Sequence, residues 1–300
     1  MPHPEFMRKP LLLGTLLTLI LLASPVHAEF YSYSKYKTVI GFSITYVVEG
    51  NESLIEIARK FGLGYNEITA ANPQLDPFIP GSGNQVKIPT SWVLPEAESF
   101  DGIIINLTEM RLYYFFHQQG SQLARTFPIG IGSEGNDTPE GVFSIVEKTE
   151  NPSWYPPESI RKENPELPKV FPPGPDNPLG THAMRLSRRT ILIHGTHRPF
   201  GIGRQVSHGC IRLYPEHIPK LFKVIPVKTK VTIIRQPVKV GVVDNQVYLE
   251  VHKDHTLTLN YFDAAAGLLK KKNLYDSINK EKMIMALREK KGYPVNISGE

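Results

Sequence analysis

The sequence has 300 residues, 41% of them hydrophobic and 21% charged, with a formal net charge of +5. This length allows two or three modest domains with real cores, and the 26 prolines argue against a mainly helical protein. The positive excess is mild and forms no long basic block, so no nucleic-acid partner is predicted, although an acidic polymer surface would suit it.

The N-terminus has the layout of a secretory signal peptide. Met7-Arg8-Lys9 is a basic opening, Leu11 to Ala23 is an apolar run, and Ala28 is the small residue at the predicted cleavage site. The apolar run is shorter than the stretch that a transmembrane helix normally requires. We predict that residues 1–28 are removed, with residues 1–6 a cloning remnant or an alternative start. The expected product is a soluble periplasmic protein that does not span the membrane.

Residues 44–90 predict a small α+β module. Ile44 to Val48 favours a strand, and a helix is indicated over Ser53 to Phe61 because its apolar residues recur on one helical face. Asn66 to Asn72 predicts a second short helix, and Gln85 to Pro89 predicts a closing strand. The order is therefore strand, helix, helix, strand.

This module resembles a LysM domain. The matching segments are Tyr46-Val47-Val48-Glu49-Gly50, Leu54-x-x-Ile57-Ala58, Asn72-Pro73, Ile79-Pro80-Gly81 and Lys87-Ile88-Pro89. LysM domains bind glycans that contain N-acetylglucosamine, so the resemblance implies a peptidoglycan-binding module. A spacer that does not bind glycan is the alternative.

The composition becomes β-rich over residues 100–236. Alternating or continuous apolar runs predict strands and one short helix, followed by a final strand. The strands are expected at Gly102 to Leu107, Arg111 to Phe116, Leu123 to Ile129, Gly141 to Lys148, Thr190 to His194 and Lys230 to Arg235, and the helix at Glu216 to Val224.

Two segments between these strands require interpretation. Gly130 to Gly135 matches G-x-G-x-x-G, but Asn136-Asp137-Thr138-Pro139 follows directly, so no helix can begin there to bind a pyrophosphate. Glu150 to Gly180 is rich in proline, and the aromatic rings of Trp154 and Tyr155 argue against disorder. We interpret it as a lid over a site, with a packed structural loop as the alternative.

Cys210 is the only cysteine in the sequence. It has no disulfide partner within the chain, and export would place its thiol in an oxidising compartment, so a purely structural role is less expected. His194 and His208 are near in sequence, and a nearby imidazolium would lower the thiol pKa. Gly209 leaves room for main-chain N–H groups to face a carbonyl oxygen. The pattern indicates an acyl-transfer enzyme with a cysteine nucleophile.

Two other interpretations of the same residues remain open. Cys210 can be a small buried hydrophobic residue and His208 a core histidine. Alternatively, His194, His197, His208 and Cys210 are all possible zinc ligands, although their spacing matches no common ligand pattern. No metal or organic cofactor is predicted.

From roughly Ile44 to Pro237, the chain resembles the L,D-transpeptidases with the YkuD fold, and more narrowly their ErfK/YbiS/YcfS/YnhG branch. The segments that carry the resemblance are Pro128-Ile129-Gly130-Ile131-Gly132, Asp137-Thr138-Pro139, Gly174-Pro175-Asp176-Asn177-Pro178, Ile193-His194-Gly195-Thr196, Phe200-Gly201-Ile202-Gly203 and Val206-Ser207-His208-Gly209-Cys210-Ile211-Arg212-Leu213. The resemblance implies a YkuD-type β-sandwich, and hence a mainly β chain with a LysM module before it.

The resemblance also implies roles for individual residues. Cys210 attacks the carbonyl that follows the L-centre of a diamino acid in a tetrapeptide stem, and D-alanine leaves. His194 is the base, oriented by the carbonyl of Gly195. The main-chain N–H groups of His208, Gly209 and Cys210 hold the oxyanion, and the side chain of His208 supports the site.

Substrate-binding residues are expected around this centre. The fork of Arg212 suits a substrate carboxylate, with a surface arginine as the alternative. Ser207, Trp154 and Tyr155 complete the predicted substrate-binding set. His208, Cys210 and Arg212 would share one face if the chain there is extended.

The predicted function is peptidoglycan L,D-transpeptidation, which serves cell wall organisation and cell shape. The acceptor amine would be a lysine of an outer-membrane lipoprotein or the diaminopimelate of a second stem. Water as acceptor would instead make the protein an L,D-carboxypeptidase or a hydrolase of cross-links. A non-catalytic wall-binding protein is the alternative from another class.

Residues 237–300 predict a small α+β appendage. Val238 to His252 indicates a hairpin that turns at Asp244-Asn245, and Asp276 to Lys291 predicts a helix capped by Asp276 and followed by Gly292. No chemistry is evident there, so a structural or docking role is expected.

Overall fold

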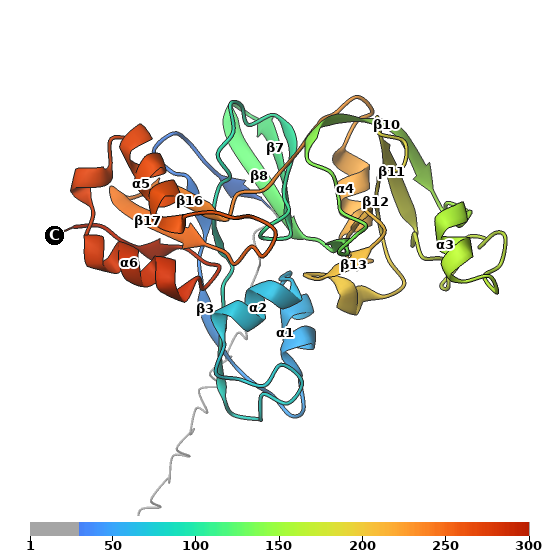
Figure 1. Cartoon of the computed structure of the whole chain (residues 1–300), viewed down its shortest axis with the longest axis horizontal. Helices are drawn as coiled ribbons and strands as arrows, with labels where there is room; N and C mark the ends of the chain where they lie inside the picture. The colour runs from blue at the N-terminus through green and yellow to red at the C-terminus, as the bar shows by residue number, and fades with distance from the viewer. Residues whose placement is uncertain (1–29, 300) are drawn as a thin grey trace, which may run out of the picture.

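The computed structural model describes residues 30–299, and the predicted signal peptide lies outside them. Figure 1 shows a central sheet, a helical pair below it and a C-terminal unit beside it. Among residues 30–299, no helix combines the length and the apolar character that crossing a bilayer requires. The prediction of a mainly β chain is confirmed.

The main sheet has nine strands in the order β1-β8-β7-β6-β15-β10-β11-β12-β14. Most of its strands come from the region predicted to be β-rich. They are β6 (Gly102–Asn106), β7 (Arg111–Gln118), β8 (Ser121–Pro128), β10 (Gly141–Glu150), β11 (His182–Leu186), β12 (Leu192–His194), β14 (Ile211–Arg212) and β15 (Lys230–Ile234). The ninth strand, β1 (Tyr31–Ser32), pairs with β8 and comes from the start of the described chain.

Strands β15 and β10 join the two halves of this sheet. β15 pairs in parallel with β6 and antiparallel with β10, which continues from residue 145 onward as the partner of β11. A register shift between Ile145 and Glu147 marks the change of partner and bends the long strand. The core on the concave side is built from Ile, Leu and Val of these strands and from α4 (Ile218–Val224).

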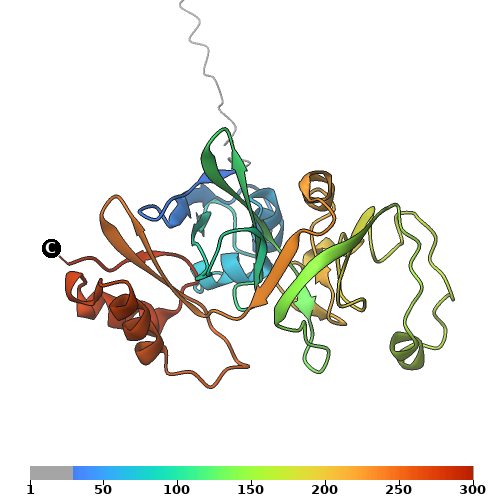
Figure 2. The same cartoon turned by 90° about the horizontal axis from the view of Figure 1, so that it is seen from above.

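The remaining short elements lie around the end of the sheet that carries β12 and β14. β9 (Ile131–Gly132) pairs with β13 (Gln205–Ser207), and a 3-10 turn covers Pro199–Gly201. No helix begins between Ser133 and Glu140, as expected from the rejection of a dinucleotide loop there. α3 (Glu158–Glu163) lies within the proline-rich segment, which Figures 1 and 2 show at the edge of the molecule.

The N-terminal module has the predicted strand, helix, helix, strand order. Within residues 44–90 these elements are β3 (Ile44–Val47), α1 (Leu54–Lys60), α2 (Tyr65–Ala71) and β4 (Gln85–Ile88), and two unpredicted strands, β2 (Val39–Gly41) and β5 (Ser91–Val93), flank them. Ser53 and Glu56 form a reciprocal capping box that begins α1. β3 pairs with β4, and β2 pairs with β5.

This module does not have a core of its own. Leu54 and Ile57 of α1 belong to the same buried cluster as Ile104, Tyr113 and Phe115 of the main sheet. Excising the module would therefore expose apolar surface that is buried in the whole chain.

A buried ion pair reinforces this junction. The guanidinium of Arg111 on β7 contacts both carboxylate oxygens of Glu67 on α2, at 2.9 and 2.7 Å, and stacks on Trp92. The indole N–H of Trp92 also donates to Glu67. Breaking such a pair leaves one buried charge without its partner, so it fixes the position of the module on the sheet.

The C-terminal unit packs two helices on a three-stranded sheet. Its elements are β16 (Val238–Val243), β17 (Gln246–Val251), α5 (Tyr261–Lys271), a 3-10 turn (Tyr275–Ser277), α6 (Lys280–Glu289) and β18 (Val295–Asn296). The predicted hairpin is present, and Asp244 and Asn245 have the positive φ angles that its turn needs.

The helix prediction for this unit was wrong in two respects. α6 begins at Lys280 rather than near Asp276, because the side chain of Asn279 accepts the N–H of Lys282 and so provides the cap. α5 was not predicted, although Asn260 caps it in the same way.

Candidate functional site

The site is built where β12 and β14 lie side by side. They pair in parallel, with His194 opposite Arg212, and Cys210 directly precedes β14. Ser207 donates a 2.6 Å hydrogen bond from its hydroxyl to the carbonyl oxygen of Cys210, and Thr138 donates one of 3.1 Å to the carbonyl oxygen of Gly209. These two hydroxyl groups hold the turn that presents the thiol.

Gly209 gives this turn its shape. Its φ is +92°, a region that residues with a side chain rarely adopt, so the chain is not extended between Ser207 and Ile211. We expected His208 and Cys210 to share a face because side chains alternate along an extended chain. That assumption is wrong here, because the chain is not extended at Gly209.

The main-chain N–H groups of this turn are available to a ligand. Within residues 30–299, the N–H groups of His208, Gly209 and Cys210 donate no hydrogen bond. Main-chain donors that lie beside a nucleophile without an acceptor of their own are suited to a developing oxyanion.

His194 is buried at the end of β12. Its Nδ1 lies 2.6 Å from the carbonyl oxygen of Gly195, which can only accept, so Nδ1 carries the hydrogen and Nε2 keeps its lone pair. Burial and then the charge of Arg212 lower the pKa of His194 to about 3. The imidazole is therefore neutral at physiological pH, with Nε2 able to accept a proton.

Cys210 is half-buried, and its thiol lies 3.7 Å from the carbonyl oxygen of Thr190. Burial raises the thiol pKa, against the lowering effects of a main-chain hydrogen bond from Leu192 and the charges of Arg212 and Arg185. No hydrogen bond among the described residues joins this sulfur to His194.

The electrostatics of this pair differ from the prediction. The sequence predicted a thiol pKa lowered by an imidazolium, but His194 is neutral and the thiol pKa is raised. The resting pair is thus a neutral thiol and a neutral imidazole, because burial disfavours both charged forms.

His208 contacts the proline-rich segment. Its exposed ring places Nε2 3.0 Å from a carboxylate oxygen of Glu163 at the end of α3. The structure thus directs this histidine to the segment predicted to be a lid, and the contact joins that segment to the turn carrying Cys210.

Arg212 is mostly buried and has no carboxylate partner among the described residues. Its Nε makes no hydrogen bond, and burial lowers the pKa of its guanidinium. A buried cation without a counter-ion beside the thiol is suited to a substrate carboxylate.

The two aromatic residues of the predicted lid have different environments. Trp154 pairs with Phe171 through two main-chain hydrogen bonds, of 2.9 and 2.8 Å, and a ring contact at 5.2 Å. Tyr155 is 71% exposed. The buried amide of Asn177 donates to the carbonyl oxygens of Pro152, Phe171 and Pro172, so the segment is ordered by its own contacts.

Sequence reasoning assigned no role to several residues near this turn. Arg185 on β11 acts electrostatically on Cys210 and forms an ion pair with Glu147. Glu163 and Thr138 contact the turn directly. Only Thr138 could have been found from the sequence, because it lies in the Asp137-Thr138-Pro139 segment that carries the family resemblance. Glu163 and Arg185 are brought near the turn by tertiary folding, which leaves no local pattern.

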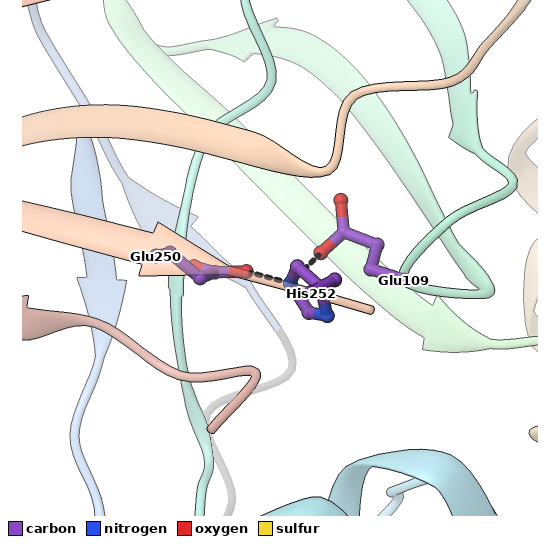
Figure 3. Close-up of side chains that lie close together, drawn as sticks. All are labelled: Glu109, Glu250 and His252. Atoms are coloured by element: carbon purple, nitrogen blue, oxygen red, sulfur yellow. Dashed lines mark hydrogen bonds and ion pairs between the residues drawn. The ribbon is translucent and has the colours of Figure 1, made fainter. Parts of the chain in front are cut away.

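The four residues considered as zinc ligands do not form a ligand group. Within residues 30–299, the one group of acidic, histidine or cysteine side chains close enough to share a metal is Glu109, Glu250 and His252, shown in Figure 3. The ammonium of Lys239 lies 2.7 Å from Glu109 and 2.8 Å from Glu250. This lysine already occupies the position of a cation between the carboxylates, so the group fits an ion-pair cluster better than a metal site.

Comparison with known proteins provides independent evidence. The YkuD family model, described as an L,D-transpeptidase catalytic domain, matches residues 101–233. The chain is 41% identical over 225 residues to the probable L,D-transpeptidase YcfS of Escherichia coli, covering 72% of this chain and 69% of that protein. It is 36% identical over 275 residues to the probable L,D-transpeptidase ErfK/SrfK of Salmonella typhimurium, covering 87% and 88%. The probable L,D-transpeptidase YbiS of Escherichia coli is 40% identical over 224 residues, with 72% of each chain covered.

Proposed function

The chain belongs to the L,D-transpeptidase family, and we propose that it transfers peptidoglycan stem peptides through a thioester on Cys210. The observation that carries this mechanism is the hydrogen bond between Nδ1 of His194 and the carbonyl oxygen of Gly195. That bond fixes the tautomer in which Nε2 is the base. It replaces the carboxylate that orients histidine in other catalytic triads.

In the first half of the reaction, the sulfur of Cys210 attacks the carbonyl carbon that precedes the terminal D-alanine. His194 takes the thiol proton as the carbon–sulfur bond forms, and the N–H groups of His208, Gly209 and Cys210 bind the oxyanion. When the intermediate collapses, the carbon–nitrogen bond breaks and His194 returns the proton to the departing amine of D-alanine. A thioester remains.

In the second half, a neutral acceptor amine replaces D-alanine. His194 removes a proton from this amine as it attacks the thioester, and the sulfur leaves and is protonated again. Arg212, which lacks a carboxylate partner among the described residues, is proposed to bind a stem carboxylate, with Ser207 holding the turn beneath it.

The proline-rich segment is proposed to shield the thioester from water. The contact between Glu163 and His208 supports this role, since it joins the segment to the catalytic turn, and Tyr155 offers an exposed ring to a substrate. The acceptor is proposed to be the lysine amine of an outer-membrane lipoprotein, with diaminopimelate of a second stem as runner-up.

The N-terminal module is proposed to be a LysM domain that binds the glycan, in a protein exported to the periplasm. Its strand, helix, helix, strand order supports this proposal. The catalytic domain is proposed over residues 100–236, with residues 237–300 as a separate α+β appendage. Because the module shares its core with the main sheet, glycan binding is best tested on the whole chain, by sedimentation with insoluble peptidoglycan.

The decisive experiment supplies disaccharide tetrapeptide with a lysine-terminated peptide and identifies the products by mass. The proposal predicts a ligated product with free D-alanine, and no product from a folded Cys210→Ala variant. Tripeptide and D-alanine without ligation would identify a carboxypeptidase. Turnover by Cys210→Ala would refute the mechanism, and binding without turnover by the parent would leave a wall-binding protein.

A carbapenem provides an independent test of the nucleophile. A neutral thiol beside unoccupied N–H donors should be acylated once, at Cys210, and intact mass should show a single adduct. An adduct that persists in Cys210→Ala would exclude this site.

A further inference from the structure

A cleft of about 1030 Å³ lies where the three parts of the chain meet. α2 forms one wall, the loops around β9 and β13 form the second, and the segments after β17 and α6 form the third. Figure 1 shows α2 between the C-terminal unit and β13. The space is large enough for a disaccharide with part of a peptide.

Buried ion pairs fix the walls of this cleft relative to one another. Arg111 and Glu67 join α2 to the main sheet. Lys239 on β16 contacts Glu109 of the main sheet, Glu250 of β17 and the carbonyl oxygen of Val93 on β5. The cleft is therefore formed in advance, which reduces the entropic cost of binding a ligand there.

The lining of the cleft contains more lysines and arginines than acidic residues. Arg204, Lys253 and Lys290 have no carboxylate partner among the described residues. Arg204 stacks on Tyr65, and its Nε is buried without an acceptor, while the ammonium of Lys290 lies 3.5 Å from the ring centre of Tyr261. Glu134 is an exposed acid of the same lining that forms no ion pair among the described residues. Over the whole lining, five lysines and arginines face four acids, an excess of one positive charge. Asp137 and Asp254 lie beside Arg235, and Glu289 lies beside Lys291, so the unpaired groups are the three cations and Glu134.

The cleft adjoins the turn that carries Cys210. Gln205 of its lining lies on β13, which leads into that turn. The carbonyl oxygen of Asp137, another lining residue, lies 3.4 Å from the position that a Cβ on Gly209 would occupy. A polymer bound in the cleft would therefore pass beside the catalytic turn.

We infer that this cleft binds a peptidoglycan strand through the carboxylates of its stem peptides, with Arg204, Lys253 and Lys290 as the cationic contacts. The inference rests on the proposed function, because that function supplies the polymer. It assigns the C-terminal unit a role in substrate binding, distinct from Arg212 at the thiol.

The test measures equilibrium binding of the whole chain to two insoluble probes. One probe is intact peptidoglycan, and the other is stripped glycan: the same material after an amidase has removed the stem peptides and the carboxylates that this hydrolysis leaves on the sugars have been converted to amides. The double variant Lys253→Glu and Lys290→Glu should weaken binding to intact peptidoglycan roughly tenfold, because two ionic contacts become repulsive. Its affinity for the stripped glycan should stay at the parent level.

Two matched variants control for charge and folding. Lys271→Glu with Lys280→Glu makes the same charge change on the same unit, outside the cleft, and should leave binding unchanged. Glu134→Gln removes the opposing charge and should tighten binding to intact peptidoglycan about twofold. A folding defect cannot produce tighter binding.

Contrary results can refute either the assignment of the cleft or the proposed function. Unchanged binding by the Lys253 and Lys290 variant, an equal loss with the Lys271 and Lys280 variant, or an equal loss on stripped glycan would refute the cleft assignment. Carbapenem acylation of the parent reports the proposed function separately. If a carbapenem acylates the parent but the Lys253 and Lys290 variant binds intact peptidoglycan as the parent does, only this inference is refuted. If a carbapenem never acylates the parent, the proposed chemistry is refuted whatever the binding result.

Discussion

Alkylation of Cys210 as a function of pH tests whether the resting site holds a neutral pair. A drop in the pKa of His194 from its ordinary value to about 3 corresponds to about 5 kcal/mol in favour of the neutral ring, at about 1.4 kcal/mol for each pH unit. At pH 7, only about one molecule in 10⁴ would carry an imidazolium. The thiolate at that pH therefore arises from ordinary ionisation of a thiol whose pKa burial has raised.

The rate of reaction with iodoacetamide should follow the thiolate population. Because the thiol pKa lies above its ordinary value, the rate should rise about tenfold per pH unit between about pH 5 and pH 8. Intact mass at timed intervals gives this rate directly, since Cys210 is the only cysteine. Circular dichroism at each pH would show that the fold is unchanged over that range.

The variant His194→Gln separates the two mechanisms. Without a resting ion pair, its alkylation profile should match the parent within a factor of about three. Its acylation by a carbapenem should nevertheless fall roughly 10²–10⁴-fold, because the base is lost. A plateau in the parent's alkylation rate below pH 7 that disappears in His194→Gln would refute the neutral pair.

Three further substitutions test the architecture. Arg111→Met leaves Glu67 buried without its partner, so urea unfolding should show a loss of about 3–5 kcal/mol, and an unchanged midpoint would contradict the role of the pair. Lys239→Met should cost a similar roughly 3–5 kcal/mol, because two carboxylates lose their shared cation. Glu163→Gln removes the charge that contacts His208. That contact is partly exposed, so the ratio of hydrolysis to transfer should rise only about two- to fivefold. A ratio equal to the parent's would exclude a role of the contact between Glu163 and His208 in shielding the thioester.

The sequence identified the L,D-transpeptidase family because the motifs that carry the resemblance are local. Cys210, Gly209 and His208 are consecutive, and Gly195 follows His194 directly, so their roles could be proposed without knowledge of the fold. The helix at α1 was found for the same reason, because its apolar face lies within the nine residues from Ser53 to Phe61.

The protonation state of the site could not be predicted in this way. It depends on the burial of His194 and on the charge of Arg212, which lies opposite His194 on the neighbouring strand β14. The contact between Arg111 and Glu67 likewise joins residues 44 positions apart. Neither burial nor such pairing leaves a periodic signal in the sequence.

The helix errors have a different origin. Asp276 and Asn279 are both acceptable caps, and only the geometry of the N–H of Lys282 distinguishes them. α5 was missed although Asn260 and the apolar spacing of Ala265 and Leu269 were present. Gly267 in its centre weakens the helical propensity, and packing against β16 compensates.

The position of β15 determines when the protein can fold. This strand, Lys230–Ile234, is the link between β6 and β10, so the two halves of the main sheet stay unjoined until three quarters of the chain has been synthesised. β1, at the opposite end of the described chain, must in turn find β8 across about ninety residues. Contacts between such distant segments form slowly. A chain that emerges amino end first from a ribosome or a translocation channel would keep an incomplete main sheet until β15 has emerged. The catalytic site would therefore form in one late step.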